Sequence, residues 1–152
     1  MHKLNFELVP DGCWFSNLRN NLPKKVWDVV RKDAYQRANG KCMICNRKVS
    51  RLEAHERWSY DEEKGIQKLE DVIAVCNSCH SVIHIGRTQL VGDIDRAIAH
   101  FCKVNECNYA EYIKSLGKAN EEHRRRNLVP EWCLDVSFLE KYRIKTQTLN
   151  DL

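Results

Sequence analysis

Four of the eight cysteines in this 152-residue chain form two Cys-x-x-Cys pairs, and this arrangement constrains the fold more than any other feature. The first pair is Cys42 and Cys45, and the second is Cys76 and Cys79. Zinc prefers four tetrahedral sulfur or nitrogen ligands, and a Cys-x-x-Cys turn can present two thiolates to one ion. The sequence therefore predicts one structural zinc site that joins two segments of the chain.

Disulfide bonds are the alternative use of eight cysteines, and they belong to secreted proteins. The N-terminus, residues 1–8, lacks the apolar region of a secretion signal. We therefore expect a cytoplasmic protein in a reducing compartment, where this spacing favours a metal over disulfides. The other four cysteines show no ligand spacing: Cys13, Cys102, Cys107 and Cys133.

Composition places the chain among soluble globular proteins, since hydrophobic residues make up 43% and charged residues 30%. No run of about 18 apolar residues is present, so we expect no transmembrane helix and no membrane partner. The length suits a single domain over residues 1–152.

Hydrophobic periodicity predicts strands and helices in the first half of the chain. Alternation in residues 4–8 predicts a short strand, and apolar residues four apart predict a helix after Pro23 that stops at Asn39-Gly40. Residues 51–60 and 66–69 are expected to form a hairpin around a polar turn.

The second half of the chain is expected to be mainly helical. After the short apolar run 72–75, a helix should begin within the second cysteine pair and end near Gly86. Two amphipathic stripes predict further helices, and a tail from Pro130 to Leu139 is expected to pack back onto the core. The predicted fold class is α+β.

Charge is distributed unevenly along the chain. Residues 19–51 carry a net charge of +8, whereas residues 53–71 carry −4. A basic segment beside an acidic one that contains histidine is compatible with phosphate binding at a metal site, although charge runs are also common on solvated helix faces. The basic candidates for nucleic-acid binding on the predicted helix are Lys24, Lys25, Arg31 and Lys32.

Three histidines accompany the cysteine pairs. His55 lies on the first predicted strand, and His80 and His84 are four residues apart on the predicted helix. This spacing places both imidazoles on one helical face, which is a common way to bind a divalent metal.

Together these motifs resemble the HNH endonucleases of the ββα-metal superfamily. The resemblance is carried by Lys-Cys-Met-Ile-Cys at 41–45, Leu-Glu-Ala-His-Glu at 52–56 and the segment 73–84, and it extends over most of the chain. It implies a ββα-metal core with a four-cysteine zinc site over residues 24–88, including the preceding basic helix, and a helical C-terminal extension over 89–152.

The resemblance also implies roles for individual residues. His55 matches the general base that activates water, and His80 and His84 match ligands of a catalytic metal, which would be Mg²⁺, Mn²⁺, Ni²⁺ or Zn²⁺. The four paired cysteines match the structural zinc site. The expected partner is nucleic acid, with DNA favoured over RNA, and Arg87 is a further candidate for phosphate contact.

Two positions depart from the family pattern. The residue before the base is usually a metal-binding His or Asp, and here it is Ala54. The middle Asn of the motif falls near Asp71, whose carboxylate is expected to orient His55. Asp61 is a candidate replacement ligand, whereas Glu56 should point to the opposite face of the strand.

Three functions are compatible with these motifs. They are a metal-dependent endonuclease that cuts phosphodiester bonds, a module that binds nucleic acid without cutting it, and a zinc-stabilised protein–protein module. Salt-sensitive affinity for nucleic acid separates the first two from the third.

Overall fold

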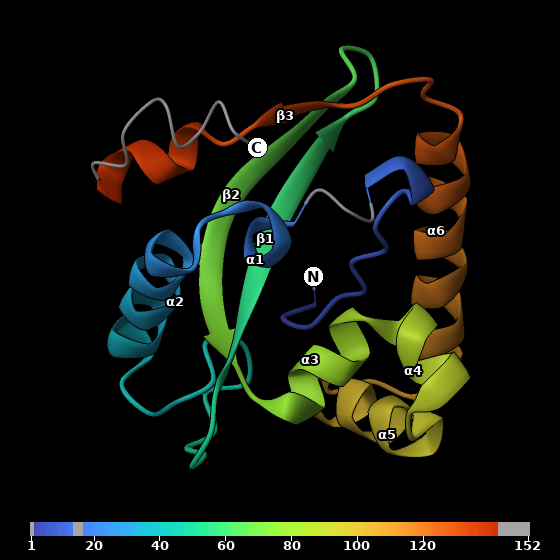
Figure 1. Cartoon of the computed structure of the whole chain (residues 1–152). Coiled ribbons are helices and arrows are strands. Elements are labelled where there is room, and N and C mark those ends of the chain that lie inside the picture. Colours follow the sequence, from blue (N-terminus) through green and yellow to red (C-terminus); the bar gives the residue numbers. More distant parts are fainter. Residues whose placement is uncertain (1, 14–16, 143–152) are drawn as a thin grey trace.

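A computed structural model describes residues 2–13 and 17–142 and shows an α+β fold (Figure 1). The ends of the predicted domain, residues 1 and 143–152, lie outside the described residues. The strands are β1 (Glu53–Asp61), β2 (Ile66–Val75) and β3 (Cys133–Asp135). The helices are η1 (Asp11–Cys13), α1 (Leu18–Asn21), α2 (Lys24–Ala38), α3 (Asn77–Ile83), α4 (Ile85–Val91), α5 (Ile94–Asn105), α6 (Tyr109–Asn127) and η2 (Ser137–Tyr142).

β1 and β2 form the predicted hairpin. They pair antiparallel from Glu53 opposite Val75 to Asp61 opposite Ile66. The register shifts next to Arg57, where β2 carries one additional residue. Pairing resumes beyond this bulge, so the predicted return strand 66–69 and the apolar run 72–75 belong to one continuous strand.

The hairpin separates two hydrophobic clusters, and this determines where each helix lies. On one face, Val72 and Ala74 pack with α2 and with the buried Leu139 of η2. On the other face, Ile73 and Val75 pack with α3, α5 and α6. Figure 1 shows α2 on one side of the sheet and α3 to α6 on the other.

The predicted strand at residues 4–8 is not formed. The backbone of Leu4 is hydrogen-bonded to the Asn105 side chain at 3.0 and 2.8 Å, and the Glu7 N–H donates to the Ile83 carbonyl at 2.9 Å. The segment is extended, as the alternation indicated, but it lies against helix ends instead of a strand edge. Its apolar side chains therefore still face the core, and Leu4 is fully buried.

The helix that starts in the second cysteine pair ends at Ile83 and not near Gly86. His84 leaves the helical conformation, with φ −95° and ψ 51°, and α4 begins at the next residue. The Thr88 hydroxyl donates to the Ser81 carbonyl at 2.6 Å, which satisfies a carbonyl near the end of α3.

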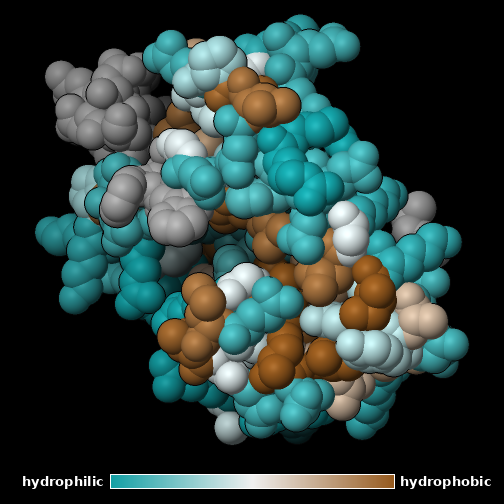
Figure 2. Space-filling model, turned by 90° about the vertical axis from the view of Figure 1, so that its right-hand side faces the viewer, coloured by the Kyte–Doolittle hydropathy of each residue, from teal (hydrophilic) through white to brown (hydrophobic). Residues whose placement is uncertain are grey.

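The C-terminal third is helical, as predicted, and its tail returns to the sheet. β3 pairs parallel to the start of β2, and Leu139 is buried beside α2. On the α6 side, apolar surface gathers over the lower half of the molecule (Figure 2), and α4 exposes Leu90 and Val91. Among the described residues, no helix is both long and apolar enough to cross a membrane.

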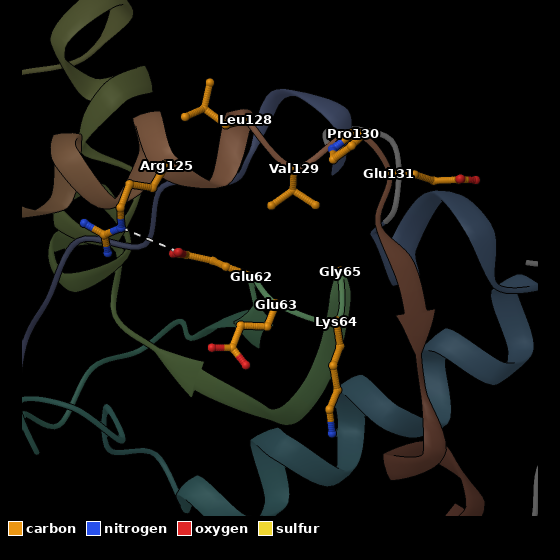
Figure 3. Close-up of a pocket in the computed structure, with 9 residues that line it drawn as sticks. All are labelled: Glu62, Glu63, Lys64, Gly65, Arg125, Leu128, Val129, Pro130 and Glu131. Carbon is orange, nitrogen blue, oxygen red and sulfur yellow. Dashed lines mark ion pairs between the residues drawn. The ribbon is translucent and has the colours of Figure 1, made fainter.

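Gly65 fits the hairpin tip closely against the returning tail. It has a φ of 65°, its carbonyl accepts from the Cys133 N–H at 2.7 Å, and a Cβ built there would lie 2.8 Å from the Glu131 carbonyl oxygen. Figure 3 shows the hollow that this crossing forms, with an ion pair between Arg125 and Glu62 at its side.

We predict that Gly65→Ala lowers the free energy of unfolding by about 1–3 kcal/mol. A Cβ adds strain at this positive φ and clashes with the Glu131 carbonyl. Gly117→Ala is the matched control: the position lies within α6, and a Cβ there meets nothing within 4 Å. It should stabilise by about 0.5–1 kcal/mol. Urea denaturation measures both changes. Equal changes in unfolding free energy for the two variants would contradict a close approach of the tail to Gly65.

Candidate metal centres

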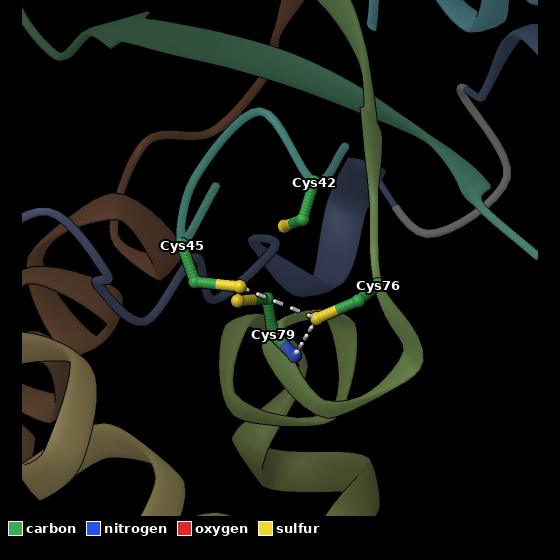
Figure 4. A group of neighbouring side chains, drawn as sticks. All are labelled: Cys42, Cys45, Cys76 and Cys79. Atoms are coloured by element: carbon green, nitrogen blue, oxygen red, sulfur yellow. Dashed lines mark hydrogen bonds between the residues drawn. The ribbon is translucent and has the colours of Figure 1, made fainter. Parts of the chain in front are cut away.

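The two cysteine pairs meet at one end of the hairpin (Figure 4). The four sulfur atoms of Cys42, Cys45, Cys76 and Cys79 lie within 4.8 Å of one another. Asn46, with a φ of 63°, turns the first pair back, and the Met43 N–H donates to the Ala74 carbonyl at 2.9 Å. Four close cysteines in this arrangement can bind a structural metal such as zinc.

Hydrogen bonding among the thiols shows why a cation would stabilise this cluster. A hydrogen bond from Cys79 lowers the pKa of the Cys42 thiol, and the same bond, with burial, raises the pKa of Cys79. Burial also raises the pKa of Cys45. The thiols therefore compete for protons, and a divalent cation removes the competition because it stabilises every ligand as a thiolate.

His100 is a neighbour of this cluster that the sequence analysis missed. It lies on α5, and its Nε2 is 3.2 Å from the sulfur of Cys79. Burial lowers the pKa of His100, which favours the neutral ring. A neutral imidazole N–H can donate to a thiolate, so His100 is placed to stabilise Cys79 in the form that binds a metal. No short motif includes His100, because α4 lies between the second cysteine pair and α5.

The structure brings His55, His80 and His84 together at the junction of β1 and α3. One ligand atom from each ring lies within 4.8 Å of the other two. The ring of His55 is centred 5.4 Å from that of His80 and 5.3 Å from that of His84, and the Nε2 atoms of His80 and His84 are 3.1 Å apart. These three side chains can hold one metal ion.

Burial favours the uncharged form of His80 and His84. It lowers the pKa of His80, and it lowers the pKa of His84 to about 4, with help from the neighbouring His80 and His55. An imidazole ligates a metal through an unprotonated nitrogen. Both side chains are therefore prepared for metal binding near neutral pH.

Two carboxylates contact the histidines, and the sequence analysis assigned neither to the site. Glu53 lies 2.8 Å from Nδ1 of His80, and Glu7 lies 3.0 Å from Nε2 of His55. Strand alternation could have identified Glu53, because it lies two residues from His55 and shares its face. Nothing local could have identified Glu7, since it is 48 residues away in sequence.

Asp71 does not orient His55, contrary to the sequence-based expectation. Its carboxylate accepts from the Val72 N–H at 2.8 Å and lies 3.7 Å from Arg37 of α2. The cause is the bulge in β2, which brings Asp71 opposite Arg57 and breaks the simple alternation along the strand. Glu7 is the carboxylate beside His55.

Asp61 is not part of the histidine cluster either. It lies six residues along β1 from His55, which corresponds to roughly 20 Å at about 3.3 Å per residue. Its carboxylate instead accepts from the Lys64 N–H at 2.9 Å and closes the hairpin turn.

Neighbours of His55 on β1 point to the opposite face. Glu56 accepts from the Leu18 N–H, and burial raises its pKa to about 7, so it faces away from the histidines as predicted. Ala54 packs in the α2 cluster. A longer side chain at position 54 would extend towards α2 and away from His80 and His84.

The predicted nucleic-acid-binding residues lie in two places. Four are on α2, across the sheet from the histidines: Lys24, Lys25 and Lys32 are exposed, and Arg31 pairs with Asp28 at 2.8 Å. Arg87 is exposed on α4, three residues beyond His84. Arg57, on β1, was not singled out by the sequence analysis, and its Nε lies 4.0 Å from Glu7. Positive charge therefore flanks the histidines from β1 and α4.

No protein-family model matches the chain, and no solved structure matches it. The chain is 34% identical over 71 residues to the GATOR2 complex protein Wdr59 of Drosophila melanogaster. This similarity covers 47% of the chain but 7% of that protein. The similarity is thus confined to a small part of Wdr59.

We predict that purified protein retains zinc and that Cys45→Ser loses about one equivalent of it, because three cysteines no longer complete a tetrahedral site. Cys133→Ser, at an exposed position outside the cluster, is the control and should keep its zinc. Elemental analysis measures the metal, and thermal unfolding should show a lower Tm for the Cys45 variant. Equal zinc content in both variants would contradict a four-cysteine site.

Proposed function

We propose that this protein is a metal-dependent endonuclease of the HNH type, with a ββα-metal core that hydrolyses phosphodiester bonds in DNA. The observation that carries the proposal is the meeting of three histidines from a hairpin strand and a following helix, next to a four-cysteine cluster that anchors both. A zinc ion at the cysteines would be structural, and a second divalent ion at the histidines would be catalytic.

The geometry favours a metal-ligand role for His55 over the general-base role that the family resemblance implied. Its side chain is 4% exposed, and one of its ring nitrogens lies within 4.8 Å of a ring nitrogen of His80 and of His84. A ring nitrogen that binds a cation cannot also accept a proton from water. His55, His80 and His84 therefore form a complete three-imidazole set, and this set fits Zn²⁺ or Ni²⁺ better than Mg²⁺.

A cation held by these residues would supply Lewis acidity at the scissile phosphate. The surrounding residues support phosphate binding, because Arg57 and Arg87 flank the cluster and guanidinium groups match phosphate in shape and charge. The α2 lysines face a different side of the molecule. In this proposal they contact the nucleic-acid backbone away from the cut.

A module that binds nucleic acid without cutting it is the second candidate function. It is favoured by the low exposure of His55 and by its hydrogen bond to Glu7, because both restrict access to that ring. The exposed lysines of α2 would serve binding equally well without catalysis.

We predict that the protein nicks supercoiled plasmid in the presence of a divalent metal and that His84→Ala lowers the rate by more than about 100-fold. Loss of a metal ligand removes several kcal/mol of transition-state stabilisation, and each 1.4 kcal/mol or so is tenfold in rate. Reactions contain Mg²⁺, Mn²⁺, Ni²⁺, Zn²⁺ or EDTA. His123→Ala is the matched control, since His123 lies on α6 and bonds to the Val9 carbonyl.

Equal cleavage by both histidine variants would rule out the proposed centre. Absence of cleavage in every metal, together with gel-shift binding that weakens as salt rises, would establish the binding module instead.

A further inference from the structure

The N-terminal segment delivers one carboxylate to the histidine cluster from outside the motifs that define the site. This segment is held at several points. The Phe6 ring stacks on Phe101 of α5 at 4.9 Å between ring centres, and the Glu7 N–H donates to the carbonyl of Ile83 at the end of α3. The Glu7 backbone is thus fixed one residue away from His84 of the proposed metal centre.

The side chain of Glu7 is directed at His55. Its Oε2 lies 3.0 Å from Nε2 of His55, whose side chain is 4% exposed. A buried donor without an acceptor costs stability, so this contact requires the N–H of the ring to be on Nε2. In that tautomer Nδ1 has no proton, and its lone pair is available to a cation.

His80 shows the same pattern with the opposite nitrogen. Its Nδ1 lies 2.8 Å from Glu53, and its Nε2 lies 3.1 Å from Nε2 of His84. Histidines that ligate metals almost always donate their other ring N–H to a carboxylate, carbonyl or water, which fixes the tautomer and raises the basicity of the ligating nitrogen. Two of the three histidines in this cluster therefore have a carboxylate on one nitrogen.

We propose that Glu7 is a positioning residue of the three-histidine metal centre: its carboxylate holds His55 in the tautomer that carries hydrogen on Nε2, and it thereby sets the affinity of the centre for a divalent cation. This inference rests on the proposed three-histidine centre. It extends the site to residues that precede the hairpin by more than forty positions, and it assigns a role to the otherwise unexplained acidic residue in the apolar segment 4–8.

Arg57 completes the arrangement around Glu7. Its Nε lies 4.0 Å from the Oε2 atom that contacts His55. Arg57 is half-buried, and it approaches the carboxylate from the same strand as His55. A carboxylate between a guanidinium and an imidazole is restrained from both sides, so it can impose one ring orientation on His55.

The experiment measures binding of a second cation by isothermal titration, with Ni²⁺ as the probe and zinc-loaded, full-length protein in the cell. We expect Glu7→Ala to weaken Ni²⁺ binding by about 10- to 100-fold, and Glu7→Gln to weaken it less because an amide oxygen still accepts from Nε2. Glu53→Ala should weaken it to a similar extent through His80. Glu70→Ala is the matched control: Glu70 is exposed on β2 and bonds to Ser59.

A second readout distinguishes positioning from a purely structural role. In metal-free protein, ¹⁵N chemical shifts of the imidazole nitrogens report the tautomer of His55. We expect hydrogen on Nε2 in the wild-type protein and in Glu7→Gln, and a mixture of tautomers in Glu7→Ala. If Glu7→Ala does not fold, Glu7→Gln provides the affinity comparison, and the wild-type spectrum alone tests the tautomer.

Unchanged Ni²⁺ affinity in folded Glu7→Ala, or hydrogen on Nδ1 of His55 in the wild-type protein, would overturn the role of Glu7 and leave the three-histidine centre intact. Failure of wild-type protein to bind any second cation would overturn both. Cation binding that depends on Glu7 without any plasmid cleavage would support this inference and reject the endonuclease.

Discussion

The convergence of the four cysteines is the constraint on which the rest of the structure depends, because it joins the end of α2 to both the end of β2 and the start of α3. Cys42 follows α2 by a short turn, and Cys76 follows β2 directly and caps α3, accepting from the Cys79 N–H at 3.4 Å. A metal at this junction would therefore fix the first turn of α3, which carries His80 and ends directly before His84. Without it, a two-stranded hairpin and a seven-residue helix would have little stability of their own.

The register of the hairpin then determines whether the third histidine can reach the other two. Glu53 pairs with Val75, which directly precedes the first cysteine of the second pair, so His55 lies close to the base of α3. A slip of one residue would turn His55 towards α2 and present Ala54 or Glu56 to the helix. The bulge beside Arg57 lies beyond this region, and the pairing between the histidine strand and the cysteine junction is regular.

Much of this arrangement could be predicted from the sequence, and the remainder shows which kind of information a sequence pattern lacks. The cysteine spacing, the interval between His80 and His84, and the Asn39 stop are local signals, and each has a local physical cause. The partner of His55 has no such signal. Alternation indicated that residues 4–8 were extended, but it could not indicate that Glu7 would lie against α3 and not against a strand.

The misassigned acidic residues have a related explanation, because the bulge in β2 directs the Asp71 carboxylate to Arg37, and Asp61 is used to close the turn. The basic residues of α2 were correctly placed on a helix, yet hydrophobic periodicity cannot determine which face of a sheet that helix will cover.

The departure at Ala54 has a different meaning once the two faces of β1 are known. From the sequence, alanine before His55 looked like the loss of a metal ligand. In the structure, position 54 faces the α2 cluster, where an apolar side chain packs well and an imidazole or carboxylate would be buried away from His80 and His84. The groups that could hold a cation are therefore His55, His80 and His84, and Glu7 and Glu53 contact two of them. Alanine at position 54 is then explained by packing against the α2 cluster, on the face of β1 opposite the three histidines.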